Sequence, residues 1–170
     1  MSTPYQQHVQ SGRDIIARCA VITVSDTRNE ETDKSGRRIK ELLAEAGHQI
    51  AAYKIVADDP DELGAILDEC VGRDDVDVIL SNGGTGIARR DQTIPVIERR
   101  LQTQLPGFGE IFRMLSYEQI GSGAMLSRAI AGISRGKLLF SMPGSTKAAE
   151  LAMTKLILPE LGHLLFELRK

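Results

Sequence analysis

The chain has 170 residues, of which 42% are hydrophobic and 26% are charged, and its formal net charge at pH 7 is -2. A chain of this length fits one domain with a buried core. We expect no nucleic-acid partner, because the chain has neither a basic balance nor a basic face. We also expect no membrane span, because the apolar runs fall far short of about 20 residues.

The start of the chain is polar and lacks the apolar middle section of a signal peptide, so we expect a cytoplasmic protein. Residues 1–14 are predicted to form a flexible N-terminal arm, and residues 15–170 a single domain without repeats or linkers. Cys19 and Cys70 lie far apart, without the paired spacing of a zinc site, and both are expected to be buried thiols.

Two strand-then-helix units open the domain. The β-branched run at 17–26 predicts a strand, and the helical pattern at 35–47 follows it, with Ser35 as the expected N-cap and Gly47 just past the helix end. A second strand at 48–56 leads into a helix near 60–72, where Asp59 is expected to cap and Pro60 to occupy the first turn.

The later elements repeat this alternation. Strands are predicted at 76–81 and 137–144, each followed by a glycine loop and a helix, while 106–136 is less regular, with a short helix after a glycine turn, then a second helix that ends in a strand-like stretch. Strands that alternate with helices predict an α/β fold with a doubly wound, mostly parallel sheet and right-handed crossovers. In such sheets, ligands bind beyond the carboxyl ends of the strands.

The stretch SNGGTG at 81–86 is the first candidate site. Its glycines permit a backbone whose N–H groups point at an anion, helped by the positive end of the following helix, but a tight strand-to-helix turn would use glycine equally well. It matches neither the dinucleotide fingerprint nor the Walker A pattern. Asp91 stands just before the helix TIPVIERRL, where it could cap the helix or hold Mg²⁺ bound to phosphates.

The stretch SMPGSTKAAE at 141–150 has the same arrangement. Lys147 carries a charge suited to a phosphate or a carboxylate, although Ser145 could simply be a cap and Lys147 a solvated side chain. Asp26, Asp58 and Asp59 follow the first two strands, and in a parallel sheet they would fall at the same edge as the glycine loops. Carboxylates near anion-binding loops suit a site for a metal-bound nucleotide, although each could equally cap or be solvated.

Four ordered motifs, NGGTGIARRDQTIPVIE, PGFGEIFRMLSYEQIG, AMLSRAIAG and SMPGSTKA, closely resemble the MoaB/MogA family of molybdenum cofactor biosynthesis proteins. The resemblance covers about residues 17–160, and the forms FRMLS and PGSTKA are more similar to the MoaB branch. It implies a three-layer α/β fold with helices on both faces of the sheet. It also implies binding of molybdopterin and, in active members, transfer of AMP from Mg-ATP to the molybdopterin phosphate with release of pyrophosphate.

Residue by residue, the resemblance places the glycine loop of the family at Gly83, Gly84, Thr85 and Gly86, and its terminal-phosphate loop at Pro143, Gly144, Ser145 and Lys147. Asp91 and Thr93 match the D-x-T-P motif, and Asp58 matches a second functional aspartate, so Asp91 and Asp58 are the expected catalytic and Mg²⁺-binding residues. One departure is Ile94, an extra residue in that motif, which could shift the first helical turn.

Two other functions stay open. The same loops could serve a non-catalytic molybdopterin carrier or scaffold of the pathway, or a nucleotide-processing enzyme similar to competence-damage proteins that contain this domain. The resemblance also implies a homotrimer or homohexamer and contact with other molybdenum cofactor biosynthesis proteins. The apolar positions in FGEIFRML and the leucine-rich carboxyl terminus are consistent with an oligomer.

Overall fold

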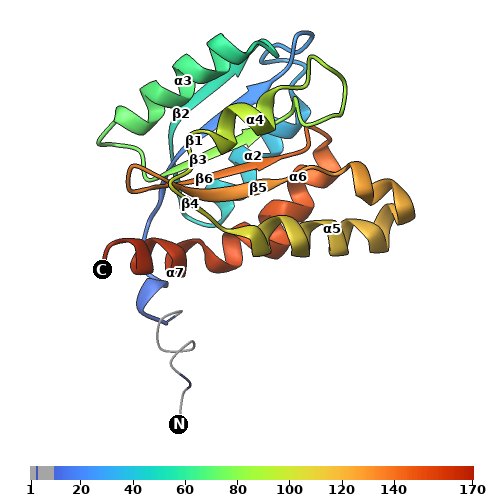
Figure 1. The fold of residues 1–170 in the computed structure, drawn as a ribbon. Helices are drawn as coiled ribbons and strands as arrows, with labels where there is room; N and C mark the ends of the chain where they lie inside the picture. The colour runs from blue at the N-terminus through green and yellow to red at the C-terminus, as the bar shows by residue number, and fades with distance from the viewer. Residues whose placement is uncertain (1–2, 4–9) are drawn as a thin grey trace.

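The structure, a computed structural model, describes residue 3 and residues 10–170. Its centre is a six-stranded sheet with the strand order β2-β1-β3-β6-β5-β4 (Figure 1). The strands are β1 (Arg18–Val24), β2 (Gln49–Val56), β3 (Val78–Asn82), β4 (Thr103–Gln104), β5 (Ile130–Ser134) and β6 (Lys137–Met142). Neighbours among β2, β1, β3 and β6 are parallel, while β5 and β4 are added antiparallel, so the predicted α/β fold with a mostly parallel sheet is confirmed.

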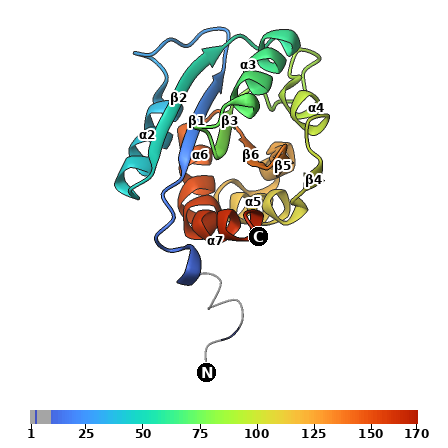
Figure 2. The same cartoon turned by 90° about the vertical axis from the view of Figure 1, so that its left-hand side faces the viewer.

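Helices cover both faces of this sheet (Figures 1 and 2). One layer holds α3 (Pro60–Gly72) and α4 (Thr93–Glu98). The other holds α2 (Lys34–Glu45), α5 (Pro106–Ile120), α6 (Thr146–Ala152) and α7 (Leu158–Leu168). The fold therefore has the three layers that the sequence resemblance implies.

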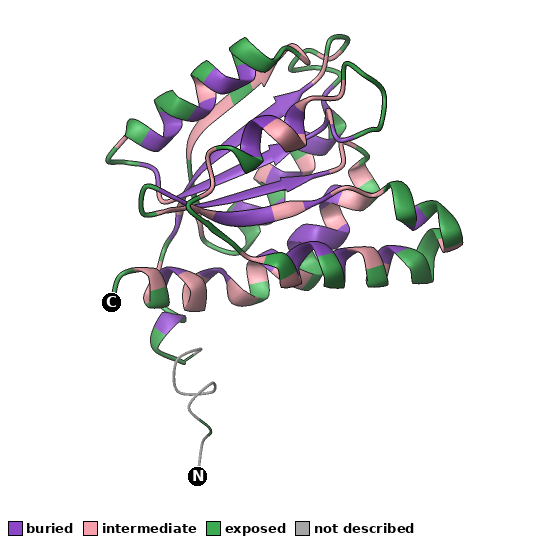
Figure 3. Cartoon of the chain, in the orientation of Figure 1, coloured by how far each residue is buried: buried purple, intermediate pink, exposed green. Residues whose placement is uncertain are grey.

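The central strands are buried on both faces, as Figure 3 shows. Successive residues of a strand point to opposite faces, so Ile79 of β3 packs in the core beneath α3 and α4, whereas Leu80 packs in the core of the other layer. This double burial explains why β1 and β3 have consecutive apolar residues rather than apolar residues that alternate with polar ones. Cys19 and Cys70 are buried free thiols, as predicted.

The helix ends agree with the sequence in part. Asp59 caps α3 by accepting hydrogen bonds from the N–H groups of Asp61 and Glu62, and Gly47 follows α2 with a φ of 80°, as predicted. Ser35, however, is not the N-cap of α2. Asp33 is, since its carboxylate accepts from the N–H of Gly36 at 3.0 Å, while Ser35 lies buried in the first turn.

The middle segment differs most from the prediction. Its first helix, α5, is longer than expected and begins at Pro106, and the expected second helix is only a 3₁₀ turn, Gly121–Leu126. The strand-like stretch after it is β5. Within residues 10–170, no helix is long and apolar enough to cross a membrane. The predicted arm at 1–14 falls mostly on residues 1–2 and 4–9, outside the described residues, and it stays a prediction.

Candidate functional site

The two glycine loops lie side by side at the carboxyl edge of the sheet. Because β3 and β6 are parallel neighbours with Asn82 opposite Met142, the loops that follow them emerge together. The N–H of Gly83 donates to the carbonyl oxygen of Met142 at 3.1 Å. A Cβ on Gly144 would lie 3.0 Å from the Cα of Gly83, so the two backbones are in contact.

The first loop has the backbone conformation of an anion cradle. Gly83 has a φ of 101° and Gly84 a φ of 60°, and a Cβ at Gly83 would lie 2.2 Å from the carbonyl oxygen of Val24. Among the described residues, none accepts a hydrogen bond from the N–H groups of Gly84, Thr85 or Gly86. Free N–H groups beside left-handed glycines can bind a phosphate. The predicted help from a helix end is weak here, since α4 begins only at Thr93 and is short.

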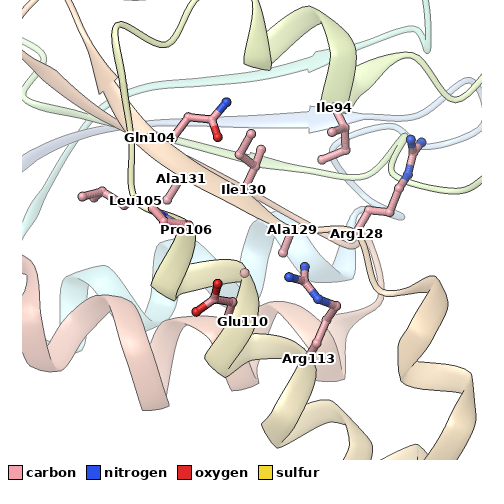
Figure 4. A pocket seen from close by; sticks show the side chains of 11 residues that line it. Ile94, Gln104, Leu105, Pro106, Glu110, Arg113, Arg128, Ala129, Ile130 and Ala131 are labelled. Atoms are coloured by element: carbon pink, nitrogen blue, oxygen red, sulfur yellow. The ribbon is translucent and has the colours of Figure 1, made fainter.

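Arg128, which the sequence reasoning did not single out, fixes the outer side of this loop. Its Nε donates to the carbonyl oxygen of Thr85 at 2.9 Å, and its Nη2 donates to the carbonyl oxygens of Gly86 and, at 3.0 Å, of Asp91. Figure 4 shows the guanidinium of Arg128 directed toward the segment that leads into α4. The available signal was the position of Arg128 inside the AMLSRAIAG motif.

Asp91 lies beside the loop and does not cap α4. The N-cap of α4 is Gln92, which makes no side-chain cap hydrogen bond, so the capping interpretation is wrong. The carboxylate of Asp91 instead accepts a hydrogen bond from the N–H of Ala88 at 2.8 Å. A Cβ at Gly86 would lie 2.5 Å from Asp91 Oδ2, so glycine at this position leaves room for the carboxylate.

Asp58 lies close to both Asp26 and Asp91 in the structure. The N–H of Asp58 donates to Asp26 Oδ1 at 2.9 Å, and Arg90 pairs with Asp26 at 3.1 Å. Burial raises the pKa of Asp58, and the negative charges of Asp91 and Asp26 raise it further, against a lowering by Arg90. The carboxylate of Asp59 caps α3. Within residues 3 and 10–170, no three acidic, His or Cys side chains gather closely enough to hold a metal ion by themselves.

Thr93 lies beneath the loop. A Cβ added at Gly84 would lie 2.1 Å from the hydroxyl oxygen of Thr93 and 3.0 Å from Asp58 Oδ1. The hydroxyls of Thr93, Ser81 and Ser141 are buried, and none has a hydrogen-bond partner among the described residues. Buried hydroxyls normally have a partner, so the surroundings of Thr93 favour a polar ligand or water near Gly84.

A buried polar network supports the loops from below. The hydroxyl of Ser35 donates to Asn82 Oδ1 at 2.7 Å, and the amide of Asn82 donates to Thr23 Oγ1 at 2.9 Å. Burial by itself would raise the pKa of Asp33. The hydrogen bonds that its carboxylate accepts outweigh burial and lower the pKa, and they come from Thr23, the N–H of Gly36, Tyr53 and Ser35. Asp33 therefore stays ionised and anchors this network.

A cavity of about 300 Å³, with a largely apolar wall and several polar side chains, opens beside the second glycine loop. Ser145 caps α6 by accepting from the N–H of Ala148 at 3.2 Å, so the cap interpretation is confirmed, while Lys147 remains exposed at the cavity. The polar side chains that line this cavity come from α5, the turn before β5 and the start of α6: Ser116, Gln119, Ser127, Ser145, Thr146 and Lys147.

A second cavity of about 290 Å³ lies between α4, α5 and the β4–β5 edge (Figure 4). Ile94 lies in its wall, so the extra residue of the motif faces this neighbouring cavity, while Thr93 begins α4 directly before it. Arg113 and Glu110 stand on α5 at the opposite side (Figure 4), and Arg128 is shared between this cavity and the glycine loop.

Comparison with known proteins identifies the family. Residues 20–163 match the family described as a probable molybdopterin binding domain. Molybdenum cofactor biosynthesis protein B of Bacillus subtilis is 56% identical over 167 residues and 97% of each chain, and that of Bacillus anthracis is 56% identical over 154 residues, or 90% of this chain and 91% of that one.

Solved structures agree. A crystal structure of a molybdenum cofactor biosynthesis protein B superposes with a TM-score of 0.89 at 55% identity, covering 91% of this chain and 97% of that one. The Mog protein of Mycobacterium ulcerans gives a TM-score of 0.80 at only 28% identity, covering 91% and 99%. The chain therefore belongs to the molybdopterin-binding-domain family, in the branch of the molybdenum cofactor biosynthesis proteins B.

Proposed function

We propose that this protein acts in molybdenum cofactor biosynthesis, where it binds molybdopterin and adenylylates the molybdopterin phosphate with Mg-ATP. The observation that carries the proposal is the pair of touching glycine loops, the first with free N–H groups at Gly84 to Gly86 and Asp58 close to Gly84, the second bordering the cavity at Pro143 and Ser145. Such a site can hold two phosphate groups close together, which is what the transfer of AMP to a phosphate requires.

The cavity beside Pro143 and Ser145 supports binding of the pterin. A pterin ring carries amide, amine and ring-nitrogen groups, and the hydroxyl and amide side chains of Ser116, Gln119 and Ser127 offer matching donors and acceptors. A phosphate on the side chain of that ring would lie at the Pro143–Ser145 loop, and Lys147 would add a positive charge to it.

The proposed reaction is a simple group transfer. An oxygen of the molybdopterin phosphate attacks the α-phosphorus of ATP, the bond from that phosphorus to the bridging oxygen breaks, and pyrophosphate leaves. Negative charge accumulates among the phosphates, so catalysis consists mainly of positioning and electrostatic stabilisation. The N–H groups of Gly84 to Gly86 would do both, because Arg128 and the contact between Gly83 and Gly144 hold that loop in place.

Asp58 and Asp91 fit a bound Mg²⁺. Burial, and after it the negative charges of Asp91 and Asp26, raise the pKa of Asp58, and a cation bound between these carboxylates would relieve the repulsion. Mg²⁺ usually takes one or two carboxylates and completes its shell with water and phosphate oxygens, so a pair is sufficient when a nucleotide is bound. The ion would neutralise phosphate charge.

A non-catalytic molybdopterin carrier remains the alternative. The observation in its favour is that no three metal-binding side chains meet within the described residues, so the protein alone offers no complete metal site. A carrier would use the same loops and the same cavity for the pterin. It would not release pyrophosphate from ATP.

We also propose that the protein assembles as a homotrimer or homohexamer and works with other proteins of the pathway. Large apolar side chains are exposed along α5 and the turn after it, where a partner chain would cover them. They are Ile111, Met114, Tyr117, Ile120, Met125 and Leu126.

The variant Asp91→Asn separates the two functions. The amide oxygen of Asn can still accept the hydrogen bond from Ala88, so the loop is retained while one negative charge is lost. We expect molybdopterin affinity within about threefold of wild type and an adenylylation rate lowered about 100-fold or more, the usual size of such electrostatic effects. Asp74→Asn, in the exposed turn before β3, is the matched control. Unchanged turnover in Asp91→Asn would remove Asp91 from the mechanism.

A further inference from the structure

Arg28 links the loop after β1 to the second glycine loop. Its Nη2 donates to the carbonyl oxygen of Gly144 at 3.0 Å, across 116 residues of sequence. Its Nη1 donates to the hydroxyl of Ser35 at 2.7 Å and lies 3.5 Å from Oδ1 of the fully buried Asp33. One side of the guanidinium thus contacts a buried carboxylate, and the other side binds the peptide carbonyl of Gly144.

The contact with Gly144 fixes the direction of a ligand-facing N–H group. In a trans peptide the carbonyl of one residue and the N–H of the next point in opposite directions. With the Gly144 carbonyl turned toward Arg28, the N–H of Ser145 points away from Arg28. Among the described residues, none accepts a hydrogen bond from that N–H. Because Gly144 also touches Gly83, the same contact supports the first glycine loop.

Asp33 and Ser35, which hold Arg28, also contact strands of the sheet, including the edge strand β2. The hydroxyl of Tyr53, on β2, donates to Asp33 Oδ2 at 2.7 Å, while Ser35 also reaches Asn82 at the end of β3. Contacts therefore run without a break from β2 through Asp33 and Arg28 to the loop after β6. A lysine could not reproduce this link, since it offers a single nitrogen where the guanidinium uses two.

We propose that Arg28 is a positioning residue of the phosphate cradle, which holds the Gly144–Ser145 peptide so that the Ser145 N–H faces the ligand phosphate. This inference rests on the proposed function, because the phosphate is taken to be that of molybdopterin. Arg28 acts through Gly144 and is not proposed to touch the reacting atoms.

The test compares Arg28→Gln and Arg28→Lys with the control Arg37→Gln. Arg37 also donates to loop carbonyls, those of Glu30 and Glu31, but it does not reach Gly144. We expect KM for molybdopterin to rise about tenfold in Arg28→Gln, the scale of one charged hydrogen bond, with kcat lowered less and partial rescue in Arg28→Lys. Arg37→Gln should match wild type.

A ligand-free measurement separates this inference from the proposed function. In ¹H–¹⁵N spectra of the unliganded protein, the amide signals of Gly144 and Ser145 should shift in both Arg28 variants and stay in place in Arg37→Gln. If wild type fails to bind molybdopterin, the proposed function fails while the spectra still report on Arg28. Unshifted amides, or a wild-type KM in Arg28→Lys or Arg28→Gln, would overturn the role of Arg28. If Arg28→Gln does not fold, Arg28→Lys decides alone.

Discussion

Arg128 donates a hydrogen bond from Nε to the carbonyl oxygen of Thr85 at 2.9 Å, and this contact ties the glycine loop to the segment just before β5. The same guanidinium reaches the carbonyl of Asp91. One side chain therefore fixes both the loop whose N–H groups we propose to face a phosphate and the backbone of the acidic residue beside it.

Replacing Arg128 by Ala should loosen both the glycine loop and the backbone at Asp91. We expect molybdopterin affinity to fall about tenfold to 100-fold, because several charge-assisted hydrogen bonds are lost together. Isothermal titration calorimetry would measure the change. Arg99→Ala is the control, because Arg99 is exposed at the end of α4. Equal affinities in Arg128→Ala and wild type would show that the loop keeps its conformation without this clamp.

Gly84→Ala should disrupt the cradle. Its φ of 60° is unfavourable for alanine, and the new Cβ would meet Thr93 Oγ1 at 2.1 Å. We expect a destabilisation of about 1 to 3 kcal/mol and loss of measurable pterin binding, checked by thermal unfolding and titration. Gly107→Ala is the matched control: nothing lies within 4 Å of its added Cβ, so both quantities should stay near wild type. A Gly84→Ala protein that binds normally would contradict the proposed loop geometry.

Asp58→Asn should stabilise the protein and impair turnover. Burial and the charges of Asp91 and Asp26 raise the pKa of Asp58 in the folded state, so its ionised form opposes folding at neutral pH. The neutral amide of Asn avoids both the burial of a charge and the repulsion. We therefore expect a higher melting temperature at pH 7, no gain below the pKa range of carboxyl groups, and a concentration of Mg²⁺ for half-maximal rate raised about tenfold. A lower melting temperature at pH 7 would count against the like-charge crowding, and an unchanged Mg²⁺ requirement against the metal role.

Acid should weaken the anchor at the amino end of β3. Hydrogen bonds from the Arg18 side chain lower the pKa of Asp77 to about 2, helped by the Arg18 N–H and by Arg169, against the effect of burial. The unfolded value is about 3.9, so the ion pair contributes stability above pH 4 that is lost as the pH falls from about 4 to 2. Since the Arg18 side chain is 40% exposed, solvent screens this ion pair, and we expect its contribution to the unfolding free energy to be small.

Urea unfolding of Asp77→Asn measures this contribution. The variant should be less stable than wild type at pH 7, and the two should converge near pH 2. A difference in unfolding free energy that does not change with pH would show that packing, not charge, accounts for the loss.

The exposed apolar surface of α5 and of the turn after it should determine assembly. Met125→Lys places a charge where a neighbouring chain would cover the 80% exposed Met125, so the oligomer should shift toward monomer in light scattering. Ile50→Lys, at an exposed position on β2 away from this surface, should keep the wild-type mass. A monomeric wild-type protein, or a full oligomer with Met125→Lys, would contradict the proposed interface.

The sequence predicts the fold well where local patterns are sufficient. Buried strands followed by polar loops place Asp26, Asp58 and both glycine loops at one edge, and Pro60 after Asp59 marks the start of α3. Two short elements escaped prediction. β4 has too few residues for any periodicity, and the 3₁₀ turn after α5 contains the same residue types as a helix.

The site was harder to predict where side chains act across long sequence distances. Ser35 and Asp33 are equally good caps by residue type, and the hydrogen bonds that Asp33 receives from Thr23 and Tyr53, on two strands, exist only in the folded chain. Asp91 stands where a helix cap is expected in the sequence, but its carboxylate accepts a hydrogen bond from the N–H of Ala88 instead. Arg28 and Arg128 bind backbone carbonyls of distant loops, and no local pattern records such contacts.

The most direct test of the central claim is an adenylylation assay with purified protein, molybdopterin and Mg-ATP that follows pyrophosphate release and adenylylated pterin. We predict that wild type forms both products in equal amounts and that Asp91→Asn binds molybdopterin but forms both about 100-fold more slowly or not at all. Pterin binding by wild type without ATP-dependent pyrophosphate release would contradict the proposed enzyme and select the carrier.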